Sequence, residues 1–590
     1  MPEDNEKITY FAKTNSRGKE MPFGIKRKDR ARHMYIIGKT GMGKSTLLEN
    51  MAIQDVRNGE GMAFIDPHGS TADRIMEYIP EHRIKDVLYF APFDMDYPVA
   101  FNVMEDVGYD KRHLVVSGLL SAFRKIWVDA WSARMEYILS NTLLALLEYP
   151  GATLLDVNRM LVNKAFRKKV VEKVTDPIVK SFWMDEFANY TDRYTQDATP
   201  AIQNKVGQFT SNPLIRNIVG QPKSSFDIRK MMDEKKIIIM NLSKGKVGEV
   251  NATLLGSMLV TKIYLAAMSR ADVPASVLQG LPSFYFYVDE FQSFSNQSFA
   301  DILSEARKYK LNLIIAHQYI EQMEEEVRNA VFGNVGTTIA FRVGPFDAEV
   351  LETIFSPQFT ATDLVNLGFA QVYLTLMING VGSPPFSATT LPPFDPPPER
   401  YVDKVLSNSR AQFGKHRTDV EEAIKKWHEL DAMEPPKPKR DAPRREYVQP
   451  QQHQDRPPQF ERPAQPQQQE RPRPQPGQHS HDSQPVRSAE AKIIGESLAH
   501  KHDMAGSKAM RDEKEPKYTP PLDGAKSLRE ALSQVTGQKF TPTPVHAPDL
   551  KDTLHSVAPQ AQATPHKPAE LPEKVLREML AVDEPEGENS

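Results

Sequence analysis

The chain has 590 residues, of which 40% are apolar and 26% are charged, enough to bury one large core or two ordinary ones. The net charge of −3 excludes a polycation, so any contact with nucleic acid has to come from local basic patches. The absence of cysteine excludes disulfides, zinc sites with thiolate ligands and thiol catalysis.

The first residues, MPEDNEKITYFAK, are charged and lack the apolar run of a signal peptide. Apolar stretches such as Tyr137–Tyr149 and Gly256–Met268 are too short or too interrupted for a membrane helix and are typical of buried helices. We therefore expect no integral membrane segment. The expected location is the cytoplasm, with at most peripheral attachment at the inner face of the cell membrane through partners.

Residues 1–33 are expected to form a short lead-in with a cluster of basic residues. The apolar segment MYIIG is short enough for a buried strand, and a glycine-rich loop and a helix over about Thr46–Arg57 follow it. The segments GMAFID and DVLYFAP are typical of two more buried strands. Because buried strands alternate with helices, residues 34–107 predict the first part of a parallel α/β sheet.

Residues 108–230 have a helical pattern instead. Side chains recur at helical spacing on one face, at Trp131, Met135, Ile138, Leu139, Thr142 and Leu146. We expect an all-α domain inserted into the α/β domain. The strand pattern returns over residues 231–400, in KKIIIMNL, SFYFYVDE, LNLIIAHQ, TTIAFRV and AQVYLTLM, with a long apolar helix over about Val250–Ser269.

A short helical extension is expected over residues 401–432. Residues 433–590 are dominated by proline, glutamine and charge, so burial cannot offset chain entropy, and a disordered tail is predicted. Two islands in this tail, SLREALSQV and ELPEKVLREML, have amphipathic helical spacing. They either dock on a partner or are a stray local pattern in a linker.

The segment Gly38–Ser45 fits the phosphate-loop pattern G-x-x-x-x-G-K-[ST], between a strand-like and a helix-like segment. Its glycines let backbone N–H groups face phosphate oxygens, and the N-terminus of the following helix points to the same place. Lys44 is expected to reach the β and γ phosphates of ATP, and Ser45 to bind Mg²⁺. The predicted nucleotide-binding residues are Gly38, Lys39, Thr40, Gly41, Met42, Gly43, Lys44, Ser45 and Thr46. The expected fold class is thus α/β: a RecA-like P-loop NTPase core with a mostly parallel sheet, an inserted all-α domain and a disordered tail.

A P-loop enzyme also needs a carboxylate for the metal, at the end of an apolar strand. Asp289 ends the strand SFYFYVDE and is expected to hold Mg²⁺, directly or through water. Glu290 beside it is predicted to act as the general base on the attacking water. The alternative is a solvated strand end. A second acidic pair, Asp185–Glu186, lies in a helical pattern inside the insertion and is not expected to take this role.

Gln318 ends the strand LNLIIAHQ and is predicted to contact the γ-phosphate or the water, unless it is simply exposed. Arg307 is predicted to reach the nucleotide of a neighbouring subunit as an arginine finger, with Arg342 as a second candidate. Either is equally explained as a surface or salt-bridge arginine. His317 is interpreted as a packing neighbour. The segment Asp66–Gly69 follows a predicted strand, and it either helps to close the site or forms a proline–glycine turn.

If this chain contacts nucleic acid, it needs cationic loops that follow the phosphates. One candidate is the pair Lys244 and Lys246, which follows a predicted strand. A second candidate is the basic run in the helical insertion, made of Lys164, Arg167, Lys168 and Lys169. Ordinary solvated charges explain both groups as well.

Eight segments of the sequence together resemble one family. They are FGIKRKDRARHMYIIGKTGMGKSTLLENM, FIDPHG, VAFN, WSARMEYILSNTLLALLEY, IIIMNLSKGKVGEVNATLLGSML, FYFYVDEFQSF, ARKYKLNLIIAHQ and NVGTTIAFRVGPFDAEVL. Their order resembles that of the coupling-protein ATPases of conjugation and type IV secretion (TraD/TraG-like), in the HerA–FtsK superfamily of P-loop DNA translocases. The resemblance covers about residues 10–400. Family members usually carry N-terminal membrane helices, which this sequence does not show.

The resemblance implies a homo-oligomeric ring, usually a hexamer, that hydrolyses ATP to move DNA through its centre. It also implies an all-α domain that faces the DNA-processing machinery, so the expected partners are DNA, a relaxase-type nucleoprotein and a secretion channel. By the same motifs, Lys44, Ser45, Asp289, Glu290 and Gln318 carry the chemistry. The alternatives are a related motor that acts on protein, for example in pilus assembly or retraction, and a non-enzymatic recruiter with a nucleotide switch. Glu290 disfavours the recruiter, since a switch does not need a water-activating carboxylate.

Overall fold

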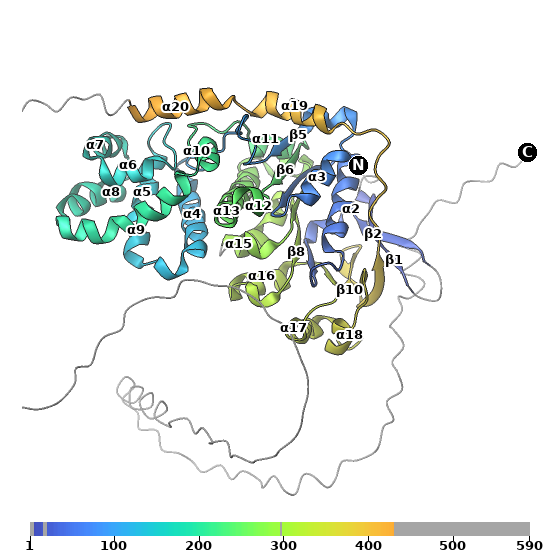
Figure 1. The fold of residues 1–590 in the computed structure, drawn as a ribbon. Coiled ribbons are helices and arrows are strands. Elements are labelled where there is room, and N and C mark those ends of the chain that lie inside the picture. Colours follow the sequence, from blue (N-terminus) through green and yellow to red (C-terminus); the bar gives the residue numbers. More distant parts are fainter. Residues whose placement is uncertain (1–4, 16–19, 296–297, 430–590) are drawn as a thin grey trace, which may run out of the picture. The chain divides into compact units, whose positions relative to one another are not determined.

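The computed structural model describes residues 5–15, 20–295 and 298–429, with backbone alone for 192–198 and Ser298. All of these residues fall in the same structural unit (Figure 1). The predicted disordered tail and its two amphipathic islands lie outside the described residues.

An eleven-stranded sheet forms the centre of this unit, in the order β2-β1-β13-β10-β9-β3-β8-β7-β4-β6-β5. Neighbours from β9 to β5 pair in parallel, and β10, β13, β1 and β2 extend the sheet with antiparallel pairs. The predicted α/β class with a mostly parallel sheet is therefore confirmed. The strands are β1 (Ile8–Thr14), β2 (Pro22–Lys26), β3 (Met34–Ile37), β4 (Gly61–Asp66), β5 (Val87–Phe90), β6 (Ile237–Asn241), β7 (Phe284–Val288), β8 (Leu311–His317), β9 (Thr337–Ala340), β10 (Gln371–Thr375) and β13 (Phe386–Thr390).

Two stretches differ from what the sequence pattern suggested. The expected lead-in contains β1 and β2, which join the sheet through β13, with Phe11 and Phe23 buried beside Phe386. Strand β2 alternates between buried and more exposed positions, and β1 does so only irregularly, which is a weaker signal than a continuous apolar run. The expected strand AQVYLTLM is divided, because β10 ends at Thr375 and a small hairpin, β11 (Met377–Ile378) and β12 (Val381–Gly382), follows.

Helices cover both faces of the sheet and make three layers. Successive strand residues point to opposite faces, so Met34 and Ile36 of β3 lie in one core and Tyr35 and Ile37 in the other. The first core is closed by α2 (Lys44–Arg57) and α3 (Ser70–Glu77), and the second by α13 (Glu249–Met268), α15 (Ser298–Glu305) and α16 (Glu325–Asn334).

Helix α13 is the long apolar helix that the sequence predicts. Among the described residues it is, with the turn after it (Glu249–Asp272), the one stretch long and apolar enough to cross a membrane by length and composition. Of its most apolar window, 72% is buried inside the unit. Burial of this kind is the property of a core helix, and its residues pack in the same core as Tyr35 and Ile37.

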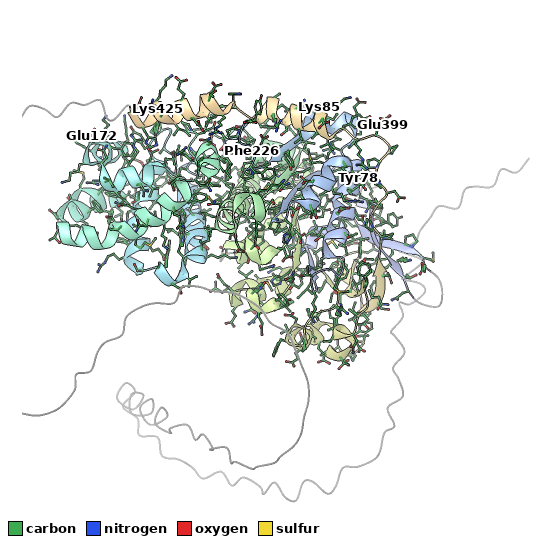
Figure 2. All side chains as sticks on the ribbon, viewed as in Figure 1. Tyr78, Lys85, Glu172, Phe226, Glu399 and Lys425 are labelled. Atoms are coloured by element: carbon green, nitrogen blue, oxygen red, sulfur yellow. The ribbon has the colours of Figure 1, made fainter. Side chains whose placement is uncertain are left out.

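The helical insertion lies between β5 and β6 and gathers beside the sheet (Figure 1). Its incoming and outgoing linkers run side by side: Phe101 N donates to Ile218 O at 3.1 Å, and Ser225 N to Ala100 O at 3.0 Å. Phe226, labelled in Figure 2, stacks on Phe101 at this junction. The helices are α4 (Arg112–Ile126), α5 (Ala133–Leu147), α6 (Asp156–Val162), α7 (Lys164–Lys173), α8 (Pro177–Ser181), α9 (Asp192–Thr210) and α10 (Pro213–Val219), and α11 (Ile228–Asp233) follows and packs on α13.

The last two described helices connect the core and the insertion (Figure 1). Helix α19 (Val402–Phe413) packs beside β5 and α3, and α20 (Arg417–Glu429) packs on α10. Trp427 of α20 donates from Nε1 to the Asp156 carboxylate of α6 at 3.1 Å. The two remaining helices after β9, α17 (Pro345–Phe355) and α18 (Ala361–Val365), pack on each other.

Candidate nucleotide-binding site

The glycine-rich turn connects β3 to α2 at the carboxyl end of the parallel strands. Gly38 has no space for a side chain, because a Cβ there would lie 2.5 Å from Cβ of Phe341. Gly43, directly before α2, has φ of 113°, a left-handed value that favours glycine. The Met42 side chain is buried in the core below the turn, so only its backbone is available to a ligand.

Lys44 lies with its ammonium group inside this turn. Nζ donates to the carbonyl oxygens of Gly38 at 2.7 Å and Lys39 at 3.2 Å, and the residue is only 5% exposed. Burial lowers the pKa of Lys44, while the charges of Glu290 and Asp289 oppose the shift. A cation held by weak carbonyl partners at the start of a helix suits an incoming anionic group.

Ser45 and Asp289 are in direct contact although they are 244 positions apart. Ser45 Oγ donates to Asp289 Oδ2 at 2.9 Å, and the backbone N–H of Asp289 donates to Ile65 O at 3.2 Å. Burial raises the pKa of Asp289 to about 6, against the opposing effect of the Ser45 hydrogen bond. The turn and the acidic strand end thus meet at one edge of the sheet.

Glu290 lies beside this pair in a left-handed backbone conformation, with φ of 47° and ψ of 53°. Its Oε2 accepts from Gln292 Nε2 at 2.5 Å, and its Oε1 lies 3.9 Å from His68 Nε2. Burial alone would raise the pKa of Glu290, but the attraction to His68, the hydrogen bond from Gln292 and the charge of Lys44 outweigh burial and lower it. The carboxylate is therefore ionised at neutral pH and able to accept a proton.

Gln318 bridges the two halves of the site. Strand β8 lies between β3 and β7, so Gln318 follows it between the glycine turn and the acidic pair. Its Nε2 donates to Thr40 Oγ1 and, at 3.4 Å, to Glu290 Oε1. His317 is buried and its Nδ1 lies 3.1 Å from the Tyr35 hydroxyl; burial lowers its pKa to about 3, so it is a neutral packing residue, as expected.

The segment Asp66–Gly69 forms a turn and also reaches the site, so the two readings of the sequence are compatible. Asp66 accepts hydrogen bonds from the backbone N–H groups of His68, at 2.8 Å, and of Thr71 and Ala72, each at 2.9 Å. These bonds fix the start of α3 and present His68 to Glu290. The contact with Glu290 raises the pKa of His68.

The two candidate arginines lie at opposite edges of the sheet. Arg307 is exposed just before β8, at the amino ends of the strands, and its charge contributes with burial to lowering the pKa of His33 to about 4. It is not brought to the site of its own chain. Arg342 is exposed after β9, and its carbonyl oxygen accepts from Lys39 N at 2.8 Å, directly against the glycine turn.

Among the other charged groups singled out in the sequence, contacts can be named for Lys244, Lys246 and Arg167. Lys244 donates to Ser293 Oγ at 3.2 Å and Glu249 at 3.1 Å, whereas Lys246 is exposed over the Phe93 ring. Arg167 donates to the Met160 and Leu161 carbonyls, which makes it part of the α6–α7 packing.

Asp185 and Glu186 lie within the insertion, as the helical pattern indicated. Asp185 accepts from the Ser181 hydroxyl at 2.9 Å, and Glu186 accepts from the hydroxyls of Tyr137 and Tyr190. These contacts connect neighbouring turns and helices of the insertion, so the pair has local structural partners.

Two residues near Glu290 were not found from the sequence. Gln292 gives no motif beyond its closeness to the acidic pair. Lys125 comes from α4 in the insertion, and its Nζ donates to the carbonyl oxygens of Gln292 and Ser295. No sequence signal marks a lysine that is some 170 positions away from its partners.

The residues present fit a magnesium ion. Ser45 Oγ and the Asp289 carboxylate offer hard oxygen donors beside the phosphate turn. Among the described residues, no group of three or more His, Asp or Glu side chains is arranged to hold a metal by itself. This agrees with the usual binding of Mg²⁺, which takes one or two protein ligands and completes its shell with phosphate oxygens and water.

Structural comparison matches the chain to solved structures of coupling and secretion ATPases. The plasmid coupling protein TrwB in complex with ADP and Mg²⁺ is 14% identical and covers 67% of this chain and 98% of its own, with a TM-score of 0.48. TrwB with the ATP analogue ADPNP gives 14% identity, 66% and 95% coverage, and a TM-score of 0.47. VirB4 of Thermoanaerobacter pseudethanolicus gives 12% identity, 61% and 89% coverage, and a TM-score of 0.43. Similarity at this level assigns no activity.

In a comparison with curated protein sequences, nothing matches the chain. A family model described as the type IV secretion-system coupling protein DNA-binding domain matches residues 20–353, which is more than half of the 590 residues. The matched part contains the glycine turn, the acidic pair and Gln318. The chain therefore belongs to the family of type IV secretion-system coupling proteins.

Proposed function

We propose that this chain is an ATPase that uses ATP and Mg²⁺ to move DNA, or a nucleoprotein such as a relaxase-bound strand, towards a type IV secretion channel. The observation that carries the proposal is the convergence of Lys44, Ser45, Asp289, Glu290 and Gln318 at one edge of the sheet. Membership of the coupling-protein family supports DNA as the substrate.

In this proposal the loop residues bind the triphosphate of ATP. Lys44 exchanges its carbonyl partners for β and γ phosphate oxygens, and the free N–H groups at the start of α2 bind the same phosphates. Ser45 and Asp289 would hold Mg²⁺, which when bound neutralises phosphate charge and helps to orient the γ-phosphate. The contact between Ser45 and Asp289 places both donors on the same side of the turn.

Glu290 accepts the proton of the attacking water, because its lowered pKa leaves it ionised. Gln318 contacts both Glu290 and Thr40, a position from which its amide can orient that water or contact the γ-phosphate. Arg307 supplies positive charge to the nucleotide of a neighbouring subunit, which requires a homo-oligomeric ring, by family expectation a hexamer.

A basic turn beside the site could couple DNA binding to ATP hydrolysis. Lys246 is exposed on α12 (Lys244–Val247), directly after β6. Lys244 N donates to Pro67 O at 2.8 Å, and its Nζ contacts Ser293. The same turn therefore contacts the segment that carries His68 and the segment that follows Glu290. Phosphates bound at Lys246 would therefore act on the geometry of the site.

The test is steady-state ATP turnover with and without DNA, for the wild type and Glu290→Gln. We expect DNA to stimulate the wild type, and the variant to lose about 10²–10⁴-fold in turnover. The variant should bind a fluorescent ADP analogue as the wild type does, because the phosphate turn is unchanged. Equal turnover of the two proteins would reject Glu290 as the base. Turnover that is insensitive to DNA but stimulated by a secreted protein would favour the protein-motor alternative.

A further inference from the structure

Helix α4 of the insertion contacts the segment after the catalytic strand end through the Lys125 side chain. Lys125 lies one residue before the end of α4, and its Nζ donates to the carbonyl oxygens of Gln292 and Ser295. Ser295 Oγ lies 3.5 Å from the same nitrogen. An ammonium group has three donors, so one lysine satisfies both carbonyls of the turn that follows Glu290.

The turn held by Lys125 returns to Glu290 through Gln292. The Gln292 side chain donates to Glu290 Oε2 at 2.5 Å, so two successive contacts connect α4 to the carboxylate. Glu290 has a left-handed φ of 47°, a conformation that costs about 1–3 kcal/mol in a residue other than glycine and needs surrounding contacts to persist. Lys125 supplies such contacts from outside the sheet.

Apolar side chains anchor the same turn independently. Phe291 and Phe294 are fully buried, and Phe294 packs against Gly256 of α13 so closely that a Cβ there would lie 2.3 Å from its ring. The fold of the turn therefore does not depend on Lys125 alone. What Lys125 adds is the orientation of two carbonyl groups, and with them the position of the Gln292 side chain.

The surroundings of Lys125 leave its ammonium group protonated and hydrogen-bonded to the two carbonyl groups. Burial lowers the pKa of Lys125 to about 8, the Glu324 carboxylate opposes this shift, and the charge of Lys244 adds to it. The group remains mainly protonated at neutral pH. A partly desolvated ammonium has few water partners to replace the Gln292 and Ser295 carbonyls, so the contact is well defined.

We propose that Lys125 is a positioning residue for hydrolysis: by orienting the 292–295 turn it sets where the Glu290 carboxylate lies, and it makes the position of helix α4 a determinant of the hydrolysis rate. This inference rests on the proposed role of Glu290 as general base. Its consequence is a connection between the helical insertion and the water-activating group, because a shift of α4 acts on the carbonyl groups that Lys125 contacts.

The test is single-turnover ATP hydrolysis by excess full-length protein, with nucleotide affinity measured separately by a fluorescent ADP analogue. Lys125→Met should lower the hydrolysis rate roughly 10–100-fold while affinity changes less than about threefold, since small misplacements of catalytic groups have effects of this size. Lys125→Arg, which keeps charge and donors, should recover most of the rate. Arg124→Met is the matched control on the same helix, where the side chain is exposed, and should behave as the wild type.

A second variant distinguishes a role of Lys125 in positioning Glu290 from a role in the folding of the protein. Gln292→Ala leaves both carbonyl groups for Lys125 and removes only the side chain that contacts Glu290. It should reproduce the Lys125→Met effect, and the double variant should be no slower than either single variant, because both act on one connection. Fully additive losses, or a Lys125→Met rate equal to the wild type, would overturn the inference. Glu290→Gln distinguishes the two proposals. If this variant hydrolyses ATP normally, the proposed role of Glu290 as general base fails, whereas a loss in Glu290→Gln with a normal Lys125→Met removes only the positioning role of Lys125.

Discussion

Arg307 and Gln318 lie at the two ends of the same strand, β8, and face opposite edges of the sheet. Gln318 contacts Glu290 at the carboxyl end, whereas Arg307 lies beyond the amino end. The seven residues of β8 span about 20 Å at the usual rise of a strand. An arginine side chain cannot cover that distance, so Arg307 cannot contact a nucleotide in the site of its own chain, and an arginine finger at this position has to act on a neighbouring subunit.

This relationship predicts complementation between two inactive variants. Arg307→Ala and Glu290→Gln should each lose most ATP turnover, about 10³-fold or more for the arginine if it acts as a finger. In a mixture, an Arg307→Ala subunit keeps its own Glu290 and receives Arg307 from a Glu290→Gln neighbour, so turnover should partly return. Lys308→Ala is the control, because Lys308 is exposed beside Arg307 and pairs with Glu305. Mixed oligomers that form but stay inactive would contradict the role in trans.

The Asp289 carboxylate is expected to lower the stability of the nucleotide-free protein although function needs it as a metal ligand. Its pKa is raised to about 6 by burial, so at neutral pH the folded protein holds an unfavourable buried carboxylate. Without nucleotide and metal, Asp289→Asn should raise the free energy of unfolding at pH 7.5 by about 1–3 kcal/mol. The same variant should lose the stabilisation by MgATP, because a metal ligand is gone.

The pH dependence of this effect has a definite sign. A raised carboxyl pKa means that the folded state binds the proton more tightly than the unfolded state, so the nucleotide-free wild type gains stability as the pH falls from about 6 to about 4. Asp289→Asn lacks this gain, so the difference between the two proteins should shrink over that range. Urea unfolding at several pH values measures it. The control is Asp185→Asn, which changes an exposed carboxylate in the insertion and should neither raise the free energy of unfolding nor alter its pH dependence. If the stability difference between wild type and Asp289→Asn shrinks only above pH 6, the raised pKa of Asp289 is contradicted.

The buried ion pair between Arg30 and Asp55 predicts a large loss of stability. Arg30 and Asp55 are 2% and 1% exposed, and two hydrogen bonds of 2.6 and 2.8 Å join them. The pair also contacts Tyr287 on β7, the strand that leads to Asp289. Asp55→Asn leaves the Arg30 charge without its partner and should lower the free energy of unfolding by about 3–5 kcal/mol.

The control for this pair is Lys28→Met, which removes an exposed ion pair with Glu6 and should change stability by at most about 1 kcal/mol. Urea unfolding followed by tryptophan fluorescence measures both variants. A loss for Asp55→Asn as small as that of the control would show that the buried charge finds another partner.

Much of the fold was predictable because its signals are local. The parallel strands are short continuous apolar runs, and nearly all of their residues are buried, so composition alone marks them. The helical insertion was predictable from its spacing. The strands β1 and β2 were not, because a strand with one exposed face and irregular alternation resembles an ordinary connecting segment.

The sequence by itself determined the glycine turn, the acidic pair and the alternation of strands and helices, because each depends on residues that are close together in the chain. The order of these local motifs along the chain then indicated the family. Only the tertiary structure decided which distant groups meet. In the structure, Ser45 contacts Asp289, and Gln318 lies between the glycine turn and the acidic pair. Arg307 lies at the amino ends of the strands, and Lys125 contacts the turn after Glu290. These relationships follow from strand order and from the packing of α4 against the core, which depend on contacts between segments many residues apart.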